Sequence, residues 1–446
     1  MAKVELSKAI SMFFAQHITH AVAAQRPIAD EIFRQLASES PGNPGITRPS
    51  YSARETAAHE LFASYASAAG CEVHTDIAVN TYMTMPGEDR SLPQVVIGSH
   101  LDTVANGGNF DGAAGVVAGL LALRALRHLG YRPPFDISVM AVRAEESAWF
   151  QVSYIGSRAA LGTLPIGALE APRVDTGCAL ADYMAECGAD AAAIRRGERH
   201  LDPARLRAYL EVHIEQAPSL AAAGQPVGIV TAIPGNFRYP DIRIVGEGGH
   251  VGTPRRYRRD AAIAAAEFAS TLDRIWEEHE AAGCAMAFTV GRFHTNPNHH
   301  AMTIVPGEFA LSLDVRAYDD ATLAALEQRV VALVAGIEQR RRVRFDLGQR
   351  ASAPVAYVDS RIRIGLEAAA DALDIPWTRL NSPASHDAAA FAAAAVPIGM
   401  VFIRNHNGSH HPEEDMAIDD FLEATKVLTW WLVHAAGHPD ANATRA

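Results

Sequence analysis

The sequence has few cysteines, no excess of positive charge and no long apolar run. Its 446 residues include four cysteines, and no two of them have CxxC spacing. These are too few to cross-link a chain of this length, so we expect a reducing, cytoplasmic environment. Lys plus Arg number 39 and Asp plus Glu number 51, a net charge of −12, which argues against nucleic acid or an anionic membrane as a partner. The longest uncharged apolar stretch, residues 112–123, is too short to span a bilayer.

Helix and strand patterns alternate along most of the chain. The first 90 residues are expected to be mostly helical, with apolar residues at helical spacing in 28–36 and 53–69. An apolar helix is then expected over 115–129, between two buried strands at 95–97 and 135–142. Strands that alternate with helices predict an α/β fold, with a mixed, mostly parallel sheet covered by helices on both faces.

The pattern changes near Pro234 and returns near Pro354. Between these positions, strands and helices follow one another as β-α-β-β-α-β, the order of a ferredoxin-like unit. We therefore expect one α/β domain formed by residues 1–233 and 354–446. It is interrupted by a smaller α+β domain of residues 234–353.

Two motifs place candidate metal ligands after the first buried strand. In GSHLDTV, His100 follows the strand, and Asp102 is near enough to accept a hydrogen bond from its second imidazole nitrogen, which would fix the tautomer of a metal ligand. In GGNFDGAAG, Asp111 opens the next helix, where a carboxylate can bridge two cations or simply cap the helix. A histidine at a strand end can also make only a local hydrogen bond, so neither motif decides the question alone.

Three further motifs carry the same residue types. Glu145 and Glu146 follow the second buried strand, and a metal would relieve their repulsion, one glutamate acting as ligand and the other handling protons; a solvated loop is the alternative. His213 lies on the polar face of a strand over 209–215, and His410 lies in the turn NGSHHPEE. A hydrogen-bonded core histidine and a polar surface turn are the alternatives here. Together, three histidines and two or three carboxylates have the ligand chemistry of a paired divalent-metal site.

Several motifs occur in a familiar order. They are GSHLDTV, GGNFDGAAGV, AEES, LEVHIEQ, GHVGTPRRYRRD, VPGEFALSLDVR, SHDA and NGSHHPEE. In this order the chain resembles the zinc-dependent N-carbamoyl-L-amino-acid hydrolases, with the β-ureidopropionases and allantoate amidohydrolases as close relatives, within the wider aminoacylase/carboxypeptidase clan. The resemblance runs from about Gly45 to about Asp420, nearly the whole chain.

The resemblance implies a role for each motif. Glu145 would be the general base, and Asp102 would orient a histidine ligand. In this family the smaller domain is a lid and a dimerisation surface, and the histidine that matches His250 reaches a neighbouring active site. The implied metal ligands are His100 and His213 for one ion, Glu146 and His410 for the other, and Asp111 between them. The implied substrate contacts are Gln216, His250, Thr303, Arg316, Ser385 and His386.

The position of Arg316 on its expected strand independently favours a substrate contact. Strand alternation puts Arg316 on the same face as Ser312 and Asp314, and its planar guanidinium suits a substrate carboxylate; a surface salt bridge is the alternative. The chain departs from its relatives at two substrate positions. Thr303 stands where they usually carry Asn, and Pro383-Ala384-Ser385 stands where they carry Gly-Ala-Gly. Pro383 has no N–H to offer a substrate carboxylate.

The expected function is metal-dependent hydrolysis of the carbamoyl C–N bond of N-carbamoyl amino acids, which releases amino acid, ammonia and CO2. Two divalent ions per subunit are expected, zinc first, although the ligand set also suits manganese, cobalt or nickel. The alternatives are an allantoate, ureidoglycine or N-carbamoyl-β-alanine amidohydrolase, an N-acyl amino-acid hydrolase or peptidase of the same clan, and a metal-binding scaffold without catalysis. We expect a homodimer formed through the smaller domain.

Overall fold

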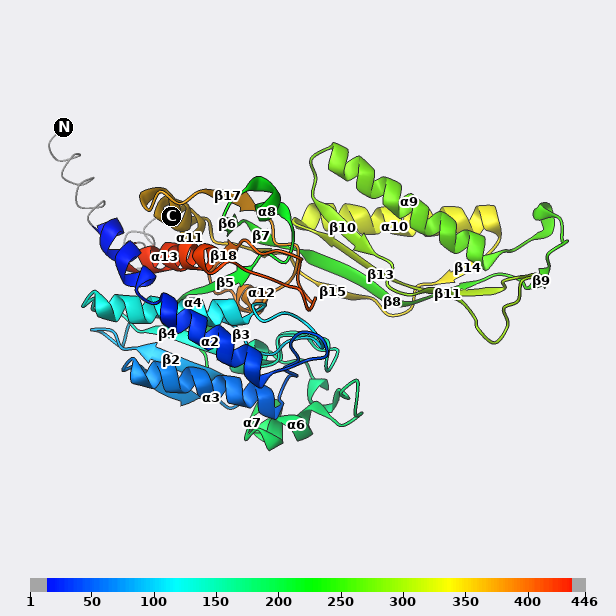
Figure 1. The fold of residues 1–446 in the computed structure, drawn as a ribbon. Coiled ribbons are helices and arrows are strands. Elements are labelled where there is room, and N and C mark those ends of the chain that lie inside the picture. Colours follow the sequence, from blue (N-terminus) through cyan, green and yellow to red (C-terminus); the bar gives the residue numbers. More distant parts are fainter. Residues whose placement is uncertain (1–13, 435–446) are drawn as a thin grey trace. The chain divides into compact units, whose positions relative to one another are not determined.

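The computed structural model describes residues 14–434, and the chain divides into two units, each with its own sheet (Figure 1). The larger unit comprises Met1–Thr231 and Tyr357–Ala446, and the smaller one comprises Ala232–Ala356.

An eight-stranded sheet forms the centre of the larger unit, in the order β1-β2-β4-β3-β5-β18-β6-β17. The pairs β4-β3, β3-β5, β5-β18 and β6-β17 are parallel. The expected α/β fold with a mixed, mostly parallel sheet is thus confirmed. The strands are β1 Glu72–Thr75, β2 Thr81–Met85, β3 Gln94–His100, β4 Ile137–Val142, β5 Leu206–Ile214, β6 Val227–Val230, β17 Trp377–Leu380 and β18 Ile398–Ile403.

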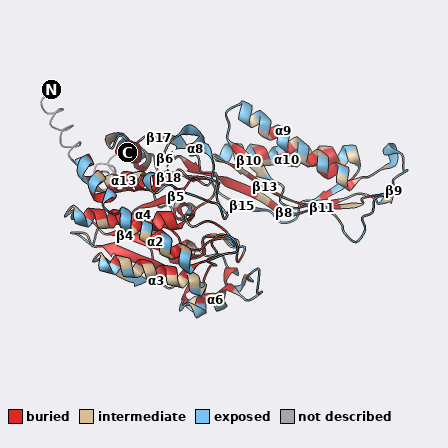
Figure 2. Ribbon diagram, in the orientation of Figure 1, coloured by how far each residue is buried: buried red, intermediate tan, exposed pale blue. Residues whose placement is uncertain are grey.

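Helices cover both faces of this sheet. Along β5, Leu210 and Val212 belong to the same apolar core as α4, in which every residue from Ala113 to Leu123 is buried (Figure 2). The alternate residue Tyr209 points to the opposite face and stacks on Phe391 of α12, with ring centroids 3.7 Å apart. Strands buried on both sides read as continuous apolar runs, which explains why β4 was visible in the sequence. The helices are α2 Arg26–Glu39, α3 Ala53–Ala68, α4 Ala113–His128, α5 Ile155–Ala160, α6 Leu180–Glu186, α7 Ala191–Arg195, α8 Ser219–Ala223, α11 Ser360–Ala372, α12 Asp387–Ala393 and α13 Ile418–His434.

The expectation that the first 90 residues are mostly helical is wrong for β1 and β2. These strands pair antiparallel with each other, and β2 pairs antiparallel with β4. β1 is a four-residue edge strand without a buried face, and β2 is buried at every position, so neither shows a period-two pattern. The first buried strand also extends further than expected, so that His100 is the last residue of β3.

The smaller unit has a sheet in the order β10-β13-β8-β14, and its neighbouring strands are antiparallel. With two helices that share one apolar core with the sheet, this is the strand order of a ferredoxin-like β-α-β-β-α-β unit. In addition, β11 pairs with β13 and β15 pairs with β8, while β9 and β12 form a separate two-stranded sheet. The elements are β8 Gly235–Val245, β9 Gly249–His250, α9 Ala261–Ala281, β10 Met286–Thr289, β11 Phe293–Thr295, β12 Ile304–Val305, β13 Glu308–Ala317, α10 Asp320–Arg341, β14 Arg344–Asp346 and β15 Ala351–Ala353.

Among residues 14–434, no helix combines the length and the apolar character that crossing a bilayer requires.

Candidate metal centre

The carboxyl ends of four neighbouring strands bring the candidate ligands together. β4, β3, β5 and β18 are consecutive and parallel, so their carboxyl ends lie at one edge of the sheet. His100 ends β3, His213 is the penultimate residue of β5, and the other three ligands lie in loops. Glu146 follows β4, His410 follows β18, and Asp111 precedes α4.

These five side chains form two groups that share Asp111. Asp111 Oδ1 lies 3.5 Å from His100 Nε2 and 3.2 Å from His213 Nε2. Asp111 Oδ2 lies 3.5 Å from His410 Nε2, which is 3.1 Å from Glu146 Oε1. In each group the ligand atoms lie within 4.8 Å of one another. Asp111 therefore presents one carboxylate oxygen to each group, as a bridging ligand would.

The imidazole rings are oriented as metal ligands would be. His100 Nδ1 lies 3.0 Å from the carbonyl oxygen of Asp102, and His213 Nδ1 lies 2.9 Å from that of Ile214. An Nδ1–H that donates to these carbonyls leaves the lone pair of Nε2 facing Asp111. Asp111 Oδ1 is buried and has no hydrogen-bond donor. Nitrogen lone pairs and a carboxylate oxygen that converge in this way fit a divalent cation.

The electrostatics of the site favour a bound cation. Burial lowers the pKa of His100, but the nearby carboxylates of Asp102 and Asp111 outweigh it and raise the pKa well above its usual value. The bond with Glu146 raises the pKa of His410 to about 9. The carboxylates that favour a proton on these rings would equally favour a metal ion in its place.

Glu145 lies beside the two groups but does not belong to either group that shares Asp111. Its Oε2 is 4.0 Å from His100 Nε2, and its side chain is buried. Burial, together with the charges of Glu146 and Asp387, raises the pKa of Glu145 well above its usual value, although His100 acts in the opposite direction. A carboxyl group with a raised pKa is suited to accept and return a proton near neutral pH.

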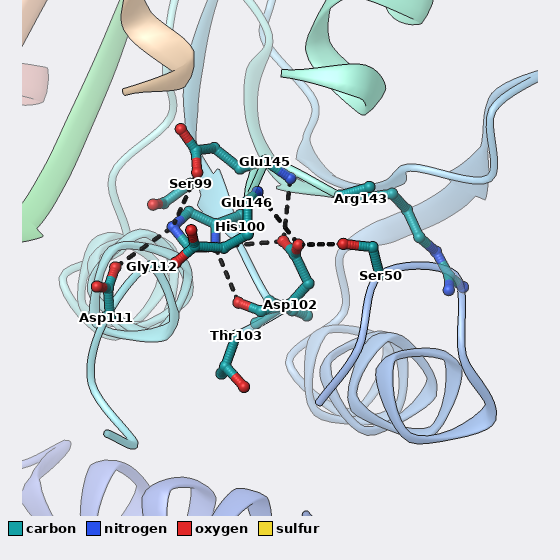
Figure 3. Close-up of polar contacts among 12 residues, drawn as sticks. Ser50, Ser99, His100, Asp102, Thr103, Asp111, Gly112, Arg143, Glu145 and Glu146 are labelled. Carbon is teal, nitrogen blue, oxygen red and sulfur yellow. Dashed lines mark hydrogen bonds and ion pairs between the residues drawn. The ribbon is translucent and has the colours of Figure 1, made fainter. Parts of the chain in front are cut away.

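Asp102 contacts both His100 and the loop of Glu145 and Glu146 (Figure 3). Its Oδ1 lies 3.3 Å from His100 Nδ1 and accepts the backbone N–H of Glu145 at 3.0 Å. Its Oδ2 accepts the backbone N–H of Glu146 at 3.2 Å and the hydroxyl of Ser50 at 2.6 Å. Asp102 therefore does more than the sequence suggested, because it also positions the loop that carries Glu145.

Two buried carboxylates were not singled out in the sequence. Glu55 of α3 accepts the backbone N–H of Ala144 at 3.0 Å and pairs with Arg143 at 3.2 Å, which supports the loop before Glu145. Glu414 accepts the backbone N–H of Asp111 at 3.1 Å, and burial raises its pKa to about 7. Glu55 has no sequence signal beyond its place on a helix, whereas Glu414 lies in the NGSHHPEE motif that drew attention to His410.

The predicted substrate residues of the larger unit lie near the metal groups. Gln216 donates its side-chain amide to Asp111 Oδ2 at 2.8 Å. The buried ring of His386 lies 4.5 Å from that of His213, and its Nε2 is 2.9 Å from the hydroxyl of Ser382. Ser385 directly precedes His386 and lies beside Tyr154. Gln216 is thus already bonded to a candidate ligand, which the sequence did not anticipate.

The remaining predicted substrate residues belong to the smaller unit. His250 of β9 pairs with Ile304 of β12, and the carbonyl of Thr303 accepts the N–H of Val251 at 2.8 Å. Arg316 is half-buried near the end of β13, where residues alternate between buried and half-buried as expected, and its guanidinium lies 3.1 Å from Asp314.

The structure does not bring His250 and Arg316 together within one chain. Eight residue steps separate Glu308 from Arg316 along β13, about 27 Å at roughly 3.4 Å per residue. β9 and β12 pair with each other as a separate two-stranded sheet beyond the Glu308 end of β13, so His250 lies farther still from Arg316, as the places of β9 and β13 in Figure 1 show.

Comparisons with known proteins agree on a single family. The profile of "Peptidase family M20/M25/M40" matches residues 96–433. The N-carbamoyl-L-amino acid amidohydrolase of Geobacillus stearothermophilus is 35% identical over 386 residues, which is 86% of this chain and 92% of that protein. The allantoate amidohydrolase of Escherichia coli is 30% identical and covers 88% of this chain and 93% of its own length. Among solved structures, a hydantoinase/carbamoylase family amidase from Burkholderia ambifaria has a TM-score of 0.78 at 31% identity, over 92% of this chain and 97% of that one.

These matches confirm the resemblance to N-carbamoyl-L-amino-acid hydrolases and allantoate amidohydrolases, and they show that the chain is a hydrolase of C–N bonds that belongs to peptidase family M20/M25/M40.

Proposed function

We propose that this enzyme cleaves the carbamoyl C–N bond of N-carbamoyl amino acids. The observation that carries the proposal is the shared carboxylate of Asp111 between two ligand groups, with the buried Glu145 beside them. The relatives at least 30% identical include enzymes named N-carbamoyl-L-amino acid amidohydrolase and allantoate amidohydrolase, and this supports the same substrate class here.

The residues present fit two divalent cations, and we propose zinc for both. His100, His213 and Asp111 would hold one ion, and Asp111, Glu146 and His410 would hold the other. The chemistry that such a pair supplies when bound is Lewis acidity, which polarises a carbonyl group and acidifies water. The mixed nitrogen and oxygen ligands also suit manganese, cobalt or nickel.

Glu145 would carry the proton. Water adds its oxygen to the carbamoyl carbon, and Glu145 accepts the proton that the water loses. When the C–N bond breaks, Glu145 returns this proton to the departing nitrogen of the amino acid. The carbamic acid that is left decomposes to ammonia and CO2. The raised pKa of Glu145 suits this exchange, because a carboxyl group with a raised pKa takes up a proton more readily.

The substrate contacts that the resemblance implies would have different tasks. Arg316 offers a planar fork of donors for a bidentate contact with the substrate carboxylate. Gln216, Ser385 and His386 would contact the ureido end from the larger unit. His250 and Thr303 would serve the active site of a second copy of the chain, since a small substrate cannot reach both His250 and Arg316 of one chain. This separation supports the expected homodimer.

A substrate panel tests the proposal. Zinc-loaded enzyme is incubated with N-carbamoyl α-amino acids, N-carbamoyl-β-alanine, allantoate and N-acetyl amino acids, and released ammonia and amino acid are measured. Equal release of ammonia and amino acid from N-carbamoyl α-amino acids, abolished by a chelator, is the expected result. Preference for allantoate would support the second candidate, which the similarity to the Escherichia coli enzyme favours. Release of acetate without ammonia, or tight binding without turnover, would overturn the proposed reaction.

A further inference from the structure

Glu414 lies in the loop that carries His410 and contacts the turn that carries Asp111. Its side chain is only 7% exposed. One carboxylate oxygen, Oε1, accepts the backbone N–H groups of Phe110 at 2.9 Å and Asp111 at 3.1 Å. These N–H groups belong to the turn that leads into α4, where backbone donors have no partner within the helix. A charged acceptor for two such donors makes strong hydrogen bonds and fixes the backbone of Asp111.

The other oxygen of Glu414 reaches the side chain of Asp111 through Ser409. Glu414 Oε2 lies 3.0 Å from Ser409 Oγ, and Ser409 Oγ is also hydrogen-bonded to Asp111 Oδ2. Asp111 Oδ2 is the oxygen that faces His410, which directly follows Ser409. Glu414 therefore contacts both the backbone and, through one hydroxyl, the carboxylate of the shared ligand.

The loop that carries His410 is closed on itself. His406 and Asp415 form an antiparallel bridge with backbone hydrogen bonds of 2.7 and 3.1 Å, and the N–H of Glu414 donates to the carbonyl of His411 at 3.1 Å. His410 itself has a φ of 58°, in the left-handed region that few side chains adopt without support. Contacts from this closed loop to Asp111 thus set the place of His410 as well.

Gly108 packs directly against the carboxyl group of Glu414 and leaves no space there for a side chain of its own. A Cβ at Gly108 would lie 2.1 Å from the carboxyl carbon of Glu414. Since no side chain fits at Gly108, the glycine and the glutamate form one packed arrangement. Glu414 is therefore packed tightly into the structure and is not a surface side chain that happens to lie near the site.

We propose that Glu414 is a positioning residue that orients Asp111 between the two metal groups and ties the His410 loop to it. This inference rests on the proposed two-metal site and extends it to a residue that touches neither ion. Partners that orient a ligand typically change metal affinity 10–100-fold when they are removed. The ion held by Glu146 and His410 should suffer most, because it depends on both the Asp111 side chain and the His410 loop.

Metal content at buffered free Zn2+ tests the proposal. Full-length wild type and the variants Glu414→Gln, Glu414→Ala and Ser409→Ala are dialysed against graded free Zn2+, and bound zinc per chain is measured together with the melting temperature. The neighbouring exposed residue supplies the matched control, Glu413→Gln. We expect two ions in wild type and control. In Glu414→Gln and Ser409→Ala, the second ion should bind 10–100-fold more weakly. Ser409→Ala keeps the backbone contacts of Glu414, so it reports on the side-chain link if Glu414→Ala does not fold.

The outcomes separate this inference from the proposed function. Wild type that binds no zinc, or one ion only, contradicts the proposed metal site itself. Wild type with two ions, and Glu414 and Ser409 variants with two ions at unchanged affinity, overturns the positioning role while leaving the site intact. A lower melting temperature with unchanged zinc affinity would show that Glu414 serves only as a structural contact, and this too overturns the proposal.

Discussion

Replacing Gly112 with alanine would place a methyl group against a candidate metal ligand. Gly112 precedes α4 with a φ of 67°, and a Cβ built there would lie 2.5 Å from each of three ring atoms of His100 (Figure 3). Ordinary carbon contacts begin near 3.5 Å, so the ring must move by about 1 Å. The backbone of Gly112 has φ 67° and ψ −52°, a conformation that side chains rarely adopt, so alanine carries a backbone penalty as well.

A displacement of about 1 Å is large for a metal ligand, whose distances are normally held within about 0.2 Å. Misplacement of a reacting group by 1 Å can lower turnover about 100-fold. We therefore expect Gly112→Ala to lose zinc from the His100–His213 group and to lose about two orders of magnitude in kcat. The N–H of Gly112 also donates to His213 Nε2 at 3.2 Å, so a backbone shift at this position would affect His213 as well.

Gly130→Ala is the matched control. Gly130 has nearly the same φ, 66°, but nothing lies within 4 Å of an added Cβ. Both variants place alanine at a positive φ, and only Gly112→Ala carries the clash. Zinc per chain at buffered free Zn2+, kcat from ammonia release and melting temperature are measured for both. If Gly112→Ala matches Gly130→Ala in zinc content and kcat, the placement of His100 as a ligand at this position is wrong.

Three further predictions follow from the site. Glu145→Gln should keep both ions and lose about 100- to 10,000-fold in turnover; metal analysis and ammonia release check this, and full activity would reject Glu145 as the base. Arg316→Lys should raise KM for N-carbamoyl amino acids with little change in kcat, because a bidentate contact is lost; an unchanged KM contradicts it. Burial, with the charge of Glu211, raises the pKa of Asp387 from its ordinary 3.8 to about 8. The stability it contributes is present below pH ~4 and lost as pH rises through ~8. In urea unfolding, the free energy of unfolding of Asp387→Asn minus that of wild type should therefore increase as pH rises from ~4 to ~8. A difference that does not change with pH would refute this prediction.

Much of the candidate site could be predicted because its side chains stand at the ends of strongly patterned elements. β3 and β4 are apolar runs, and His100, Glu145 and Glu146 come at or after their carboxyl ends. Parallel pairing of neighbouring strands brings such ends to one edge, so residue type and strand position were enough to select them.

Other parts of the molecule carried no such signal. β1 is short and exposed, and β2 is buried on both faces, so their periodicity does not separate strand from helix. Glu55 lies on a helix whose other residues give it no special place, yet its carboxylate holds the backbone of Ala144 from 89 residues away. The bond from Gln216 to Asp111 spans 105 residues. Such contacts depend on the packing of whole elements.

The sequence by itself determined the α/β class and the side chains with metal-binding chemistry, because periodicity and residue type are properties of short stretches of chain. Only the tertiary structure decided that one oxygen of Asp111 faces each ligand group and that Glu414, 303 residues away, holds its backbone. The physical reason is that a hydrogen bond or a coordination bond requires a separation of about 3 Å or less, and no local pattern contains the distance between two remote atoms.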